Sequence, residues 1–321
     1  MKKILSFLLL CAVTVSVLAG CGYASTAEER EPVFSLMGYD VPYEVYRFYV
    51  MTAKSSYGLL DEEGNTKTDD AELLSKAENA AMESVRNLYA ALKIAEQYGY
   101  SMEDEDIITE AEAYFEALRD SYEEETDFRR DMAAAYMNKS VVVLVRGAKI
   151  LENKAYEAAL ENGGIDVSDE ALRSFFDSEE VIRVKQILIQ REYFANAEEV
   201  AAIAYEKALV AEDFDTVFDL YTRSGFYTED RYLARGETVE EFEEAAFALE
   251  IGELSPVVES SAGYSILVRY EKEADLFEEE QESFAEKYYL YQFNAMLDEI
   301  KSNAEIQYYD ADGEHPFAEI K

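Results

Sequence analysis

Few side chains in this 321-residue sequence are suited to the common kinds of enzyme chemistry. It contains one histidine, His315, and two cysteines, Cys11 and Cys21. A histidine acid–base pair needs a second histidine, and a cysteine-based zinc site needs more cysteines than the chain has. Acidic runs such as residues 103–106 occur, but no loop has the spacing of an EF-hand. We therefore expect neither a metal nor another cofactor.

The charge of the chain restricts its partners. Asp and Glu number 69 against 29 Lys and Arg, which gives a formal net charge of −40. Such a surplus argues against a nucleic-acid partner, because phosphates are bound by cations. It also argues against binding to anionic membrane surfaces through the protein itself. Apolar residues make up 49% of the chain, enough for packed cores, and the length predicts two domains.

Cys21 is the side chain whose surroundings suggest a covalent modification. Lys2 and Lys3 precede an apolar stretch at 4–19, which is typical of a signal peptide. The tetrapeptide that follows, Leu-Ala-Gly-Cys at 18–21, resembles the lipobox of bacterial lipoproteins. The resemblance implies cleavage before Cys21 and a lipid on its thiol, which would anchor the protein to the outer side of the bacterial cell membrane. The alternative is an ordinary secretory signal in which Cys21 is incidental.

The stretch 181–271 contains the most specific pattern. It begins with a run of β-branched and aliphatic residues at 182–189, typical of a strand, and continues with helical patterns at 197–211 and 214–221. Three segments then stand in a characteristic order: VKQILI, ARGETVEEFEEAAFALEIGELSPVVES and AGYSILV. This order resembles the parvulin-type peptidyl-prolyl isomerase domain. The resemblance implies an antiparallel sheet flanked by helices.

The same resemblance assigns the polar positions of the site. The family usually carries one histidine in the first strand and another in the last strand. This sequence has Gln186 and Ser265 there, and Ser224 falls near the family's cysteine or aspartate position. Amide and hydroxyl groups exchange hydrogen bonds but do not titrate near neutral pH. Either Gln186 and Ser265 take over the role of the histidine pair and isomerisation is slower, or they belong to a domain that no longer catalyses.

The apolar part of the implied site grips the proline ring. Isomerisation twists the X-Pro amide against a barrier of about 20 kcal/mol, and an apolar pocket holds the proline while this happens. Leu233 and Phe242 fall where the family places the walls of that pocket, and Thr238 stands where a methionine is common. The alternative for Phe242 is simple core packing.

The flanks predict the elements that support this domain. Residues 70–160 contain no proline, and their periodicity predicts helices at about 71–97, 101–122, 127–137 and 140–160. A small hairpin at 33–41 precedes another helix. This hairpin followed by a helix resembles the start of the SurA- and PrsA-like chaperone domain. We expect the amphipathic helix at 277–302 and the strand-like segment at 304–309 to return to the N-terminal helices.

We therefore predict an α+β protein in which a parvulin-like domain is inserted into a discontinuous, all-helical chaperone-like domain. The predicted parts are a signal peptide at 1–20, a lipidated N-terminus and tether at 21–32, and the first part of the helical domain at 33–180. The parvulin-like domain follows at 181–272. The last helix and strand occupy 273–321.

The chain as a whole resembles PrsA-like and SurA-like extracytoplasmic foldases. This implies a membrane-anchored foldase or chaperone whose partners are unfolded or partly folded exported polypeptides. Its peptidyl-prolyl isomerase activity is expected to be weak or lost, because Gln186 and Ser265 replace the usual histidines. The alternative is a non-enzymatic binding lipoprotein that uses the parvulin-like domain as a scaffold for one partner or a cell-wall component. A foldase should act on many clients, whereas a dedicated binder should ignore them.

Overall fold

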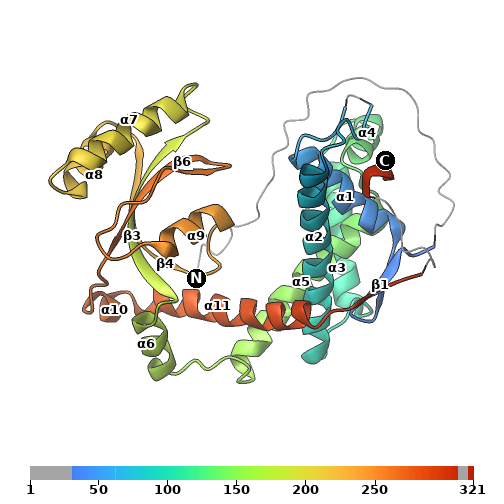
Figure 1. Cartoon of the computed structure of the whole chain (residues 1–321). Coiled ribbons are helices and arrows are strands. Elements are labelled where there is room, and N and C mark those ends of the chain that lie inside the picture. Colours follow the sequence, from blue (N-terminus) through green and yellow to red (C-terminus); the bar gives the residue numbers. More distant parts are fainter. Residues whose placement is uncertain (1–30, 62, 310–316) are drawn as a thin grey trace. The chain divides into compact units, whose positions relative to one another are not determined.

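The computed structural model describes residues 31–61, 63–309 and 317–321 (Figure 1). The predicted signal peptide, Cys21 and His315 lie outside these described residues. No helix in the described part of the chain has the length and apolar character needed to cross a membrane. The chain combines helices with antiparallel sheets, as the sequence predicts.

The chain divides into two compact units, each of which is built from separate segments. The first contains the chain up to Lys93, Met102–Ile150 and Ala304–Lys321. The second contains Ile94–Ser101 and Leu151–Asn303. The domain bounds predicted from the sequence do not coincide with this division and stay a prediction.

The first unit is helical apart from one small sheet. The sheet has the order β2-β1-β7, and both pairs are antiparallel. Its strands are β1 (Phe34–Leu36), β2 (Tyr39–Val41) and β7 (Ile306–Tyr308). The helices that lie wholly or partly in this unit are α1 (Tyr43–Ser56), α2 (Ala71–Gln97), α3 (Glu105–Asp120), α4 (Glu125–Ala134) and α5 (Lys139–Glu161). The strand expected to return to the N-terminal part therefore does so, as β7.

The last residues of the chain dock onto α1. Phe317–Glu319 form a 3-10 turn, and the side chains of Phe317 and Ile320 are buried. Lys54 of α1 has no exposed side-chain area, and its Nζ donates a hydrogen bond of 2.6 Å to the carbonyl oxygen of Ile320. The same ammonium lies 5.1 Å from the centre of the Phe317 ring. Burial lowers the pKa of Lys54 to about 8.

The second unit is organised around a four-stranded antiparallel sheet. Its strands are β3 (Val181–Gln190), β4 (Tyr227–Ala234), β5 (Val258–Ser260) and β6 (Gly263–Tyr270), in the order β4-β3-β6-β5. β3 is central and largely buried, which agrees with its run of β-branched and aliphatic residues. Because alternate residues of a strand point to opposite faces, β3 supplies two separate cores.

Helices cover both faces of this sheet. α7 (Ala197–Val210) and α8 (Phe214–Arg223) pack with Ile187 and Ile189 on one face. α9 (Glu240–Ala248) packs with Ile182 and Val184 on the other.

The second unit also contains α6 (Asp169–Asp177), α10 (Leu276–Glu279) and α11 (Gln281–Ser302), together with the last residues of α2 and α5. Phe284 of α11 packs against Phe176 of α6, with ring centres 4.8 Å apart. The same ring contacts Tyr232 of β4 at 5.2 Å. In this division of the chain, α11 therefore belongs with the sheet of the second unit, whereas β7 belongs to the first.

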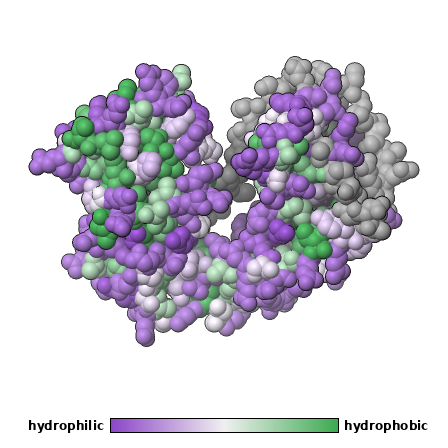
Figure 2. Space-filling model, in the orientation of Figure 1, coloured by the Kyte–Doolittle hydropathy of each residue, from purple (hydrophilic) through white to green (hydrophobic). Residues whose placement is uncertain are grey.

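The visible surface is largely hydrophilic, in keeping with the acidic composition (Figure 2). Hydrophobic residues gather over the region of α7 and α8, where four apolar side chains are exposed. These are Ile203, Leu209, Val210 and Leu220.

Candidate functional site

The two residues predicted to stand at the family's histidine positions lie side by side on the two central strands. Gln186 is on β3 and Ser265 on β6, and the register pairs Gln186 with Leu267 and Leu188 with Ser265. Both side chains therefore point to the face that α9 covers. The amide Nε2 of Gln186 donates a hydrogen bond of 2.8 Å to Oγ of Ser265. Only 6% of Gln186 and 1% of Ser265 is exposed.

A tight turn at the start of β6 sets this geometry. Gly263 has a φ of +144°, and it pairs with Gln190 at the end of β3. A Cβ at this position would collide with the carbonyl oxygen of Ile189. Only glycine lets β6 begin this close to β3, and the register that follows brings Ser265 beside Gln186.

The Gln186–Ser265 pair can take part in few kinds of catalysis. Neither group titrates near neutral pH, so the pair cannot act as a general acid or base there. Gln186 donates one of its amide hydrogens to Ser265, and burial shields both groups from water. A buried polar group that is hydrogen-bonded to a neighbour stabilises the sheet and has less capacity left for a substrate.

The apolar residues predicted to grip proline lie on the same face. Leu233 pairs with Ile182 across β4 and β3, and Phe242 projects from α9. Leu233 is 0% exposed and Phe242 is 5% exposed, and both belong to the core cluster that includes Ala246 and Leu249. The structure thus brings Leu233 and Phe242 together with the Gln186–Ser265 face, but as packed core residues whose apolar surface is covered.

Thr238 and Ser224 have local roles in the structure. Thr238 is half-buried just before α9, and its hydroxyl lies 3.4 Å from the carbonyl oxygen of Val239. Ser224 is exposed at the C-cap of α8, where its Oγ donates 2.8 Å to the carbonyl oxygen of Leu220. Any contact of either residue with a substrate stays a prediction.

Two charged residues of β4 that the sequence reading overlooked also point to this face. Glu229 pairs with Gln186 and Arg231 pairs with Val184, so both alternate with Leu233 along the same side of β4. The guanidinium carbon of Arg231 lies 5.5 Å from the centre of the Phe242 ring. Its Nε is 3.4 Å from Oε2 of Glu229. The alternation of side chains along a strand could have predicted this, because it places residues 229, 231 and 233 on one side of β4.

The opposite face of the sheet carries a separate polar cluster. Nζ of Lys185 and the hydroxyl of Tyr270 both donate to Oδ1 of Asp215, at 2.7 and 2.9 Å. These contacts lower the pKa of the Asp215 carboxyl, and burial is the main cause that raises the pKa of Tyr270. Because Asp215 lies in α8, the cluster fixes that helix to the sheet.

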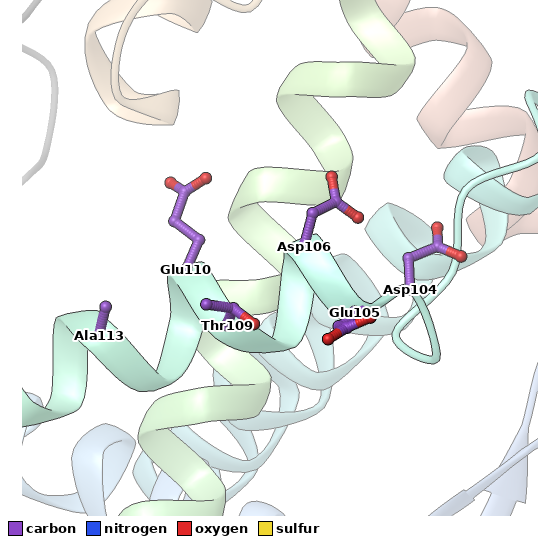
Figure 3. A pocket seen from close by; sticks show the side chains of 6 residues that line it. All are labelled: Asp104, Glu105, Asp106, Thr109, Glu110 and Ala113. Carbon is purple, nitrogen blue, oxygen red and sulfur yellow. The ribbon is translucent and has the colours of Figure 1, made fainter.

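An open surface pocket of about 720 Å³ lies in the first unit, along α3. Its lining is mainly acidic, and Figure 3 shows the side chains of Asp104, Asp106 and Glu110 following one side of the helix. In the part of the chain that the structure describes, no group of three or more His, Cys, Asp or Glu side chains is arranged to hold a metal ion.

The sheet of the second unit and the helices around it match a known family. Residues 167–286 match the family model described as the PPIC-type PPIASE domain. These residues form a parvulin-type domain. The match includes α6 and extends into α11, so it is longer than the range 181–272 predicted from the sequence.

Curated relatives extend the similarity beyond the parvulin-type domain. The chain is 26% identical over 190 residues to the foldase protein PrsA of Oceanobacillus iheyensis and 30% identical over 179 residues to that of Geobacillus kaustophilus. These alignments cover 58% and 54% of this chain, and 58% and 57% of the relatives. The chain thus spans somewhat more than half the length of the curated relatives it matches, and it is PrsA-like with a parvulin-type domain.

Solved structures of PrsA proteins give a weaker match. The PrsA peptidylprolyl isomerase of Bacillus anthracis is 17% identical and has a TM-score of 0.31, covering 68% of this chain and 96% of its own. The foldase PrsA of Streptococcus pneumoniae is 21% identical with a TM-score of 0.35, covering 76% of this chain and 90% of its own.

Proposed function

We propose that the protein is a membrane-anchored extracytoplasmic foldase that binds unfolded exported polypeptides and isomerises prolines weakly or not at all. The proposal is supported by the parvulin-type domain and by the buried, hydrogen-bonded Gln186–Ser265 pair at its predicted histidine positions. The domain supports the foldase assignment, and the pair supports the reduced activity.

The expected weakness follows from what accelerates isomerisation. A catalyst must bind the twisted amide better than the planar amide, because equal binding of both leaves the barrier unchanged. Gln186 and Ser265 hydrogen-bond each other in a site from which water is largely excluded. Phe242, which would contact the proline ring, is 5% exposed. In this state both the polar and the apolar parts of the site are occupied by the protein itself.

Two surface features support the binding of unfolded chains. The outer sides of α7 and α8 expose Ile203, Leu209, Val210 and Leu220, and Val210 is 84% exposed. Exposed apolar side chains of this kind suit the apolar segments of an unfolded polypeptide. The net charge of −40 favours basic segments at long range and keeps the protein soluble.

A proline-limited refolding assay tests the proposal on the chain from Gly22 onward. We expect suppression of aggregation for several unrelated unfolded proteins, together with little acceleration of the slow, proline-limited phase. Acceleration as strong as that of a histidine-containing parvulin would contradict the weak-isomerase assignment. Binding of a single partner, with no effect on unrelated unfolded proteins, would favour the alternative of a dedicated binding lipoprotein.

The anchor is tested separately at Cys21. The variant Cys21→Ala should yield either a soluble exported protein or an uncleaved precursor, because the proposed lipid is attached to the thiol. Cell fractionation distinguishes these forms from the anchored protein. Membrane association that persists after processing and still requires detergent for release would contradict the proposed lipid on Cys21.

A further inference from the structure

The aromatic ring expected to receive proline is covered by a side chain of the protein itself. Phe242 is 5% exposed, although it lies on the face of the sheet that carries the family's site positions. The guanidinium of Arg231 lies over the Phe242 ring, 5.5 Å from its centre. A planar cation above an aromatic face occupies the position where a proline ring would stack.

We propose that Arg231 is a specificity-determining residue, which excludes proline from Phe242 until its guanidinium is displaced. This inference rests on the proposed function in one respect: the α9 face of the sheet is taken as the place where proline binds. A peptide then gains access to Phe242 only when its proline ring contributes more than the contacts that hold Arg231 in place.

The contacts that hold the Arg231 side chain over Phe242 are weak enough for it to be displaced. Its Nε is buried and makes no hydrogen bond to any of the described residues, and unpaired buried donors are unfavourable. The same atom lies 3.4 Å from a carboxylate oxygen of Glu229, which is an ion pair rather than a hydrogen bond. Both side chains keep roughly a third of their area exposed, 31% for Arg231 and 32% for Glu229. Rotation outward would hydrate Nε and leave the guanidinium at the rim, within reach of Glu229.

The backbone does not need to move in this process. Arg231 and Glu229 belong to β4, which is paired with β3 over its whole length, so their backbone is fixed. Arginine, by contrast, has a long side chain with several rotatable bonds. The cover therefore opens by a change of rotamer, which uncovers the Phe242 ring beside its core neighbours Leu233 and Val184.

Peptide binding to three variants of the chain from Gly22 onward tests the proposal. The probes are a short labelled peptide with one Ala-Pro bond and the same peptide with Ala-Ala in its place. Arg231→Ala should tighten binding of the Ala-Pro peptide about fivefold, because apparent affinity scales with the open fraction of the site. Binding of the Ala-Ala peptide should not change. Arg231→Ala combined with Phe242→Ala should lose the gain, since the uncovered ring is then absent.

The second unit offers a matched control for the loss of charge. The guanidinium of Arg235 lies 4.1 Å from the centre of the Phe247 ring, also on α9. Arg235→Ala removes the same charge and the same kind of contact but leaves Phe242 covered, so peptide affinity should stay at the level of the unaltered chain. Circular dichroism should show that all variants keep their fold.

Three results would overturn the inference. They are an Arg231→Ala protein that binds the Ala-Pro peptide no better than the unaltered chain, a gain that persists without Phe242, and an equal gain in Arg235→Ala. Aggregation suppression, measured on the same variants, tests the proposed function independently. A gain in peptide affinity without any chaperone activity would reject the foldase assignment and keep the role of Arg231. Chaperone activity without the gain would do the reverse.

Discussion

The buried Gln186–Ser265 pair leads to a quantitative prediction on stability. Ser265→Ala removes the acceptor of the 2.8 Å hydrogen bond and leaves the Gln186 amide in a core that water hardly reaches. An unpaired buried polar group costs about 1–3 kcal/mol. Gln186→Leu leaves the Ser265 hydroxyl unpaired and should cost a similar or smaller amount. In the double variant both polar groups are gone, so the total loss should be under about 1 kcal/mol.

Hydrogen exchange is the suitable assay, because a chain with two compact units need not unfold in a single transition. Exchange of the backbone amides of β3 and β6 reports the local stability of this sheet directly. A loss of about 1.4 kcal/mol accelerates exchange about tenfold. Ser265→Ala should therefore raise the rates of these amides about 5- to 150-fold. The double variant should bring the rates back to within about fivefold of the unaltered chain.

The exposed Ser224 supplies the matched control. Ser224→Ala removes a hydroxyl at the C-cap of α8, and a surface change of this kind should cost within about 0.5 kcal/mol. The reasoning is refuted if the double variant loses the sum of the two single losses. Additive losses would mean that each side chain is stabilised by its own surroundings and that the observed hydrogen bond contributes little.

Three further predictions concern activity, pH and architecture. Gln186→His combined with Ser265→His should accelerate proline-limited refolding, most clearly when Arg231 is also replaced by Ala, and an unchanged rate would show that other parts of the site are missing. Burial lowers the pKa of Lys54 in the folded protein to about 8. Between pH 8 and 10 the unfolded chain therefore binds more protons than the folded chain. The free energy of unfolding of the first unit should therefore rise by on the order of 1 kcal/mol over this range, and Lys54→Met should abolish the slope. Truncation after Asn303 removes β7 and the docked C-terminal residues, so denaturant unfolding of the first unit should begin at lower urea concentration.

Periodic patterns allowed much of the fold to be predicted from the sequence. The helix expected at 71–97 is α2, because one apolar stripe runs along its length and Gly99 follows in the left-handed region, with a φ of +82°. The strand expected at 182–189 lies within β3, since its residues suit a strand that is buried on both faces. The segment at 304–309 contains β7, whose antiparallel pairing with β1 joins two segments that are far apart in the sequence.

The sequence could not show that the predicted site is filled by the protein's own side chains. A resemblance places Phe242 in a proline pocket, but whether its ring is accessible depends on a rotamer of Arg231, some ten residues away in sequence. The partnership of Gln186 and Ser265 depends on register, which the turn at Gly263 fixes. Charged residues such as Arg231 are read from sequence as surface positions, because most of them are exposed. Here the guanidinium of Arg231 instead lies over an aromatic ring.

These features separate two requirements that a parvulin normally meets with the same residues. Holding the sheet together favours polar groups that satisfy one another, as the buried amide and hydroxyl of Gln186 and Ser265 do. Catalysis needs donors that remain free until the amide twists, and it needs an apolar surface left open for the proline ring. In the described structure the first requirement is met at the expense of the second. A chain that only has to hold unfolded polypeptides can tolerate this, because the apolar residues exposed on α7 and α8 lie outside the covered pocket.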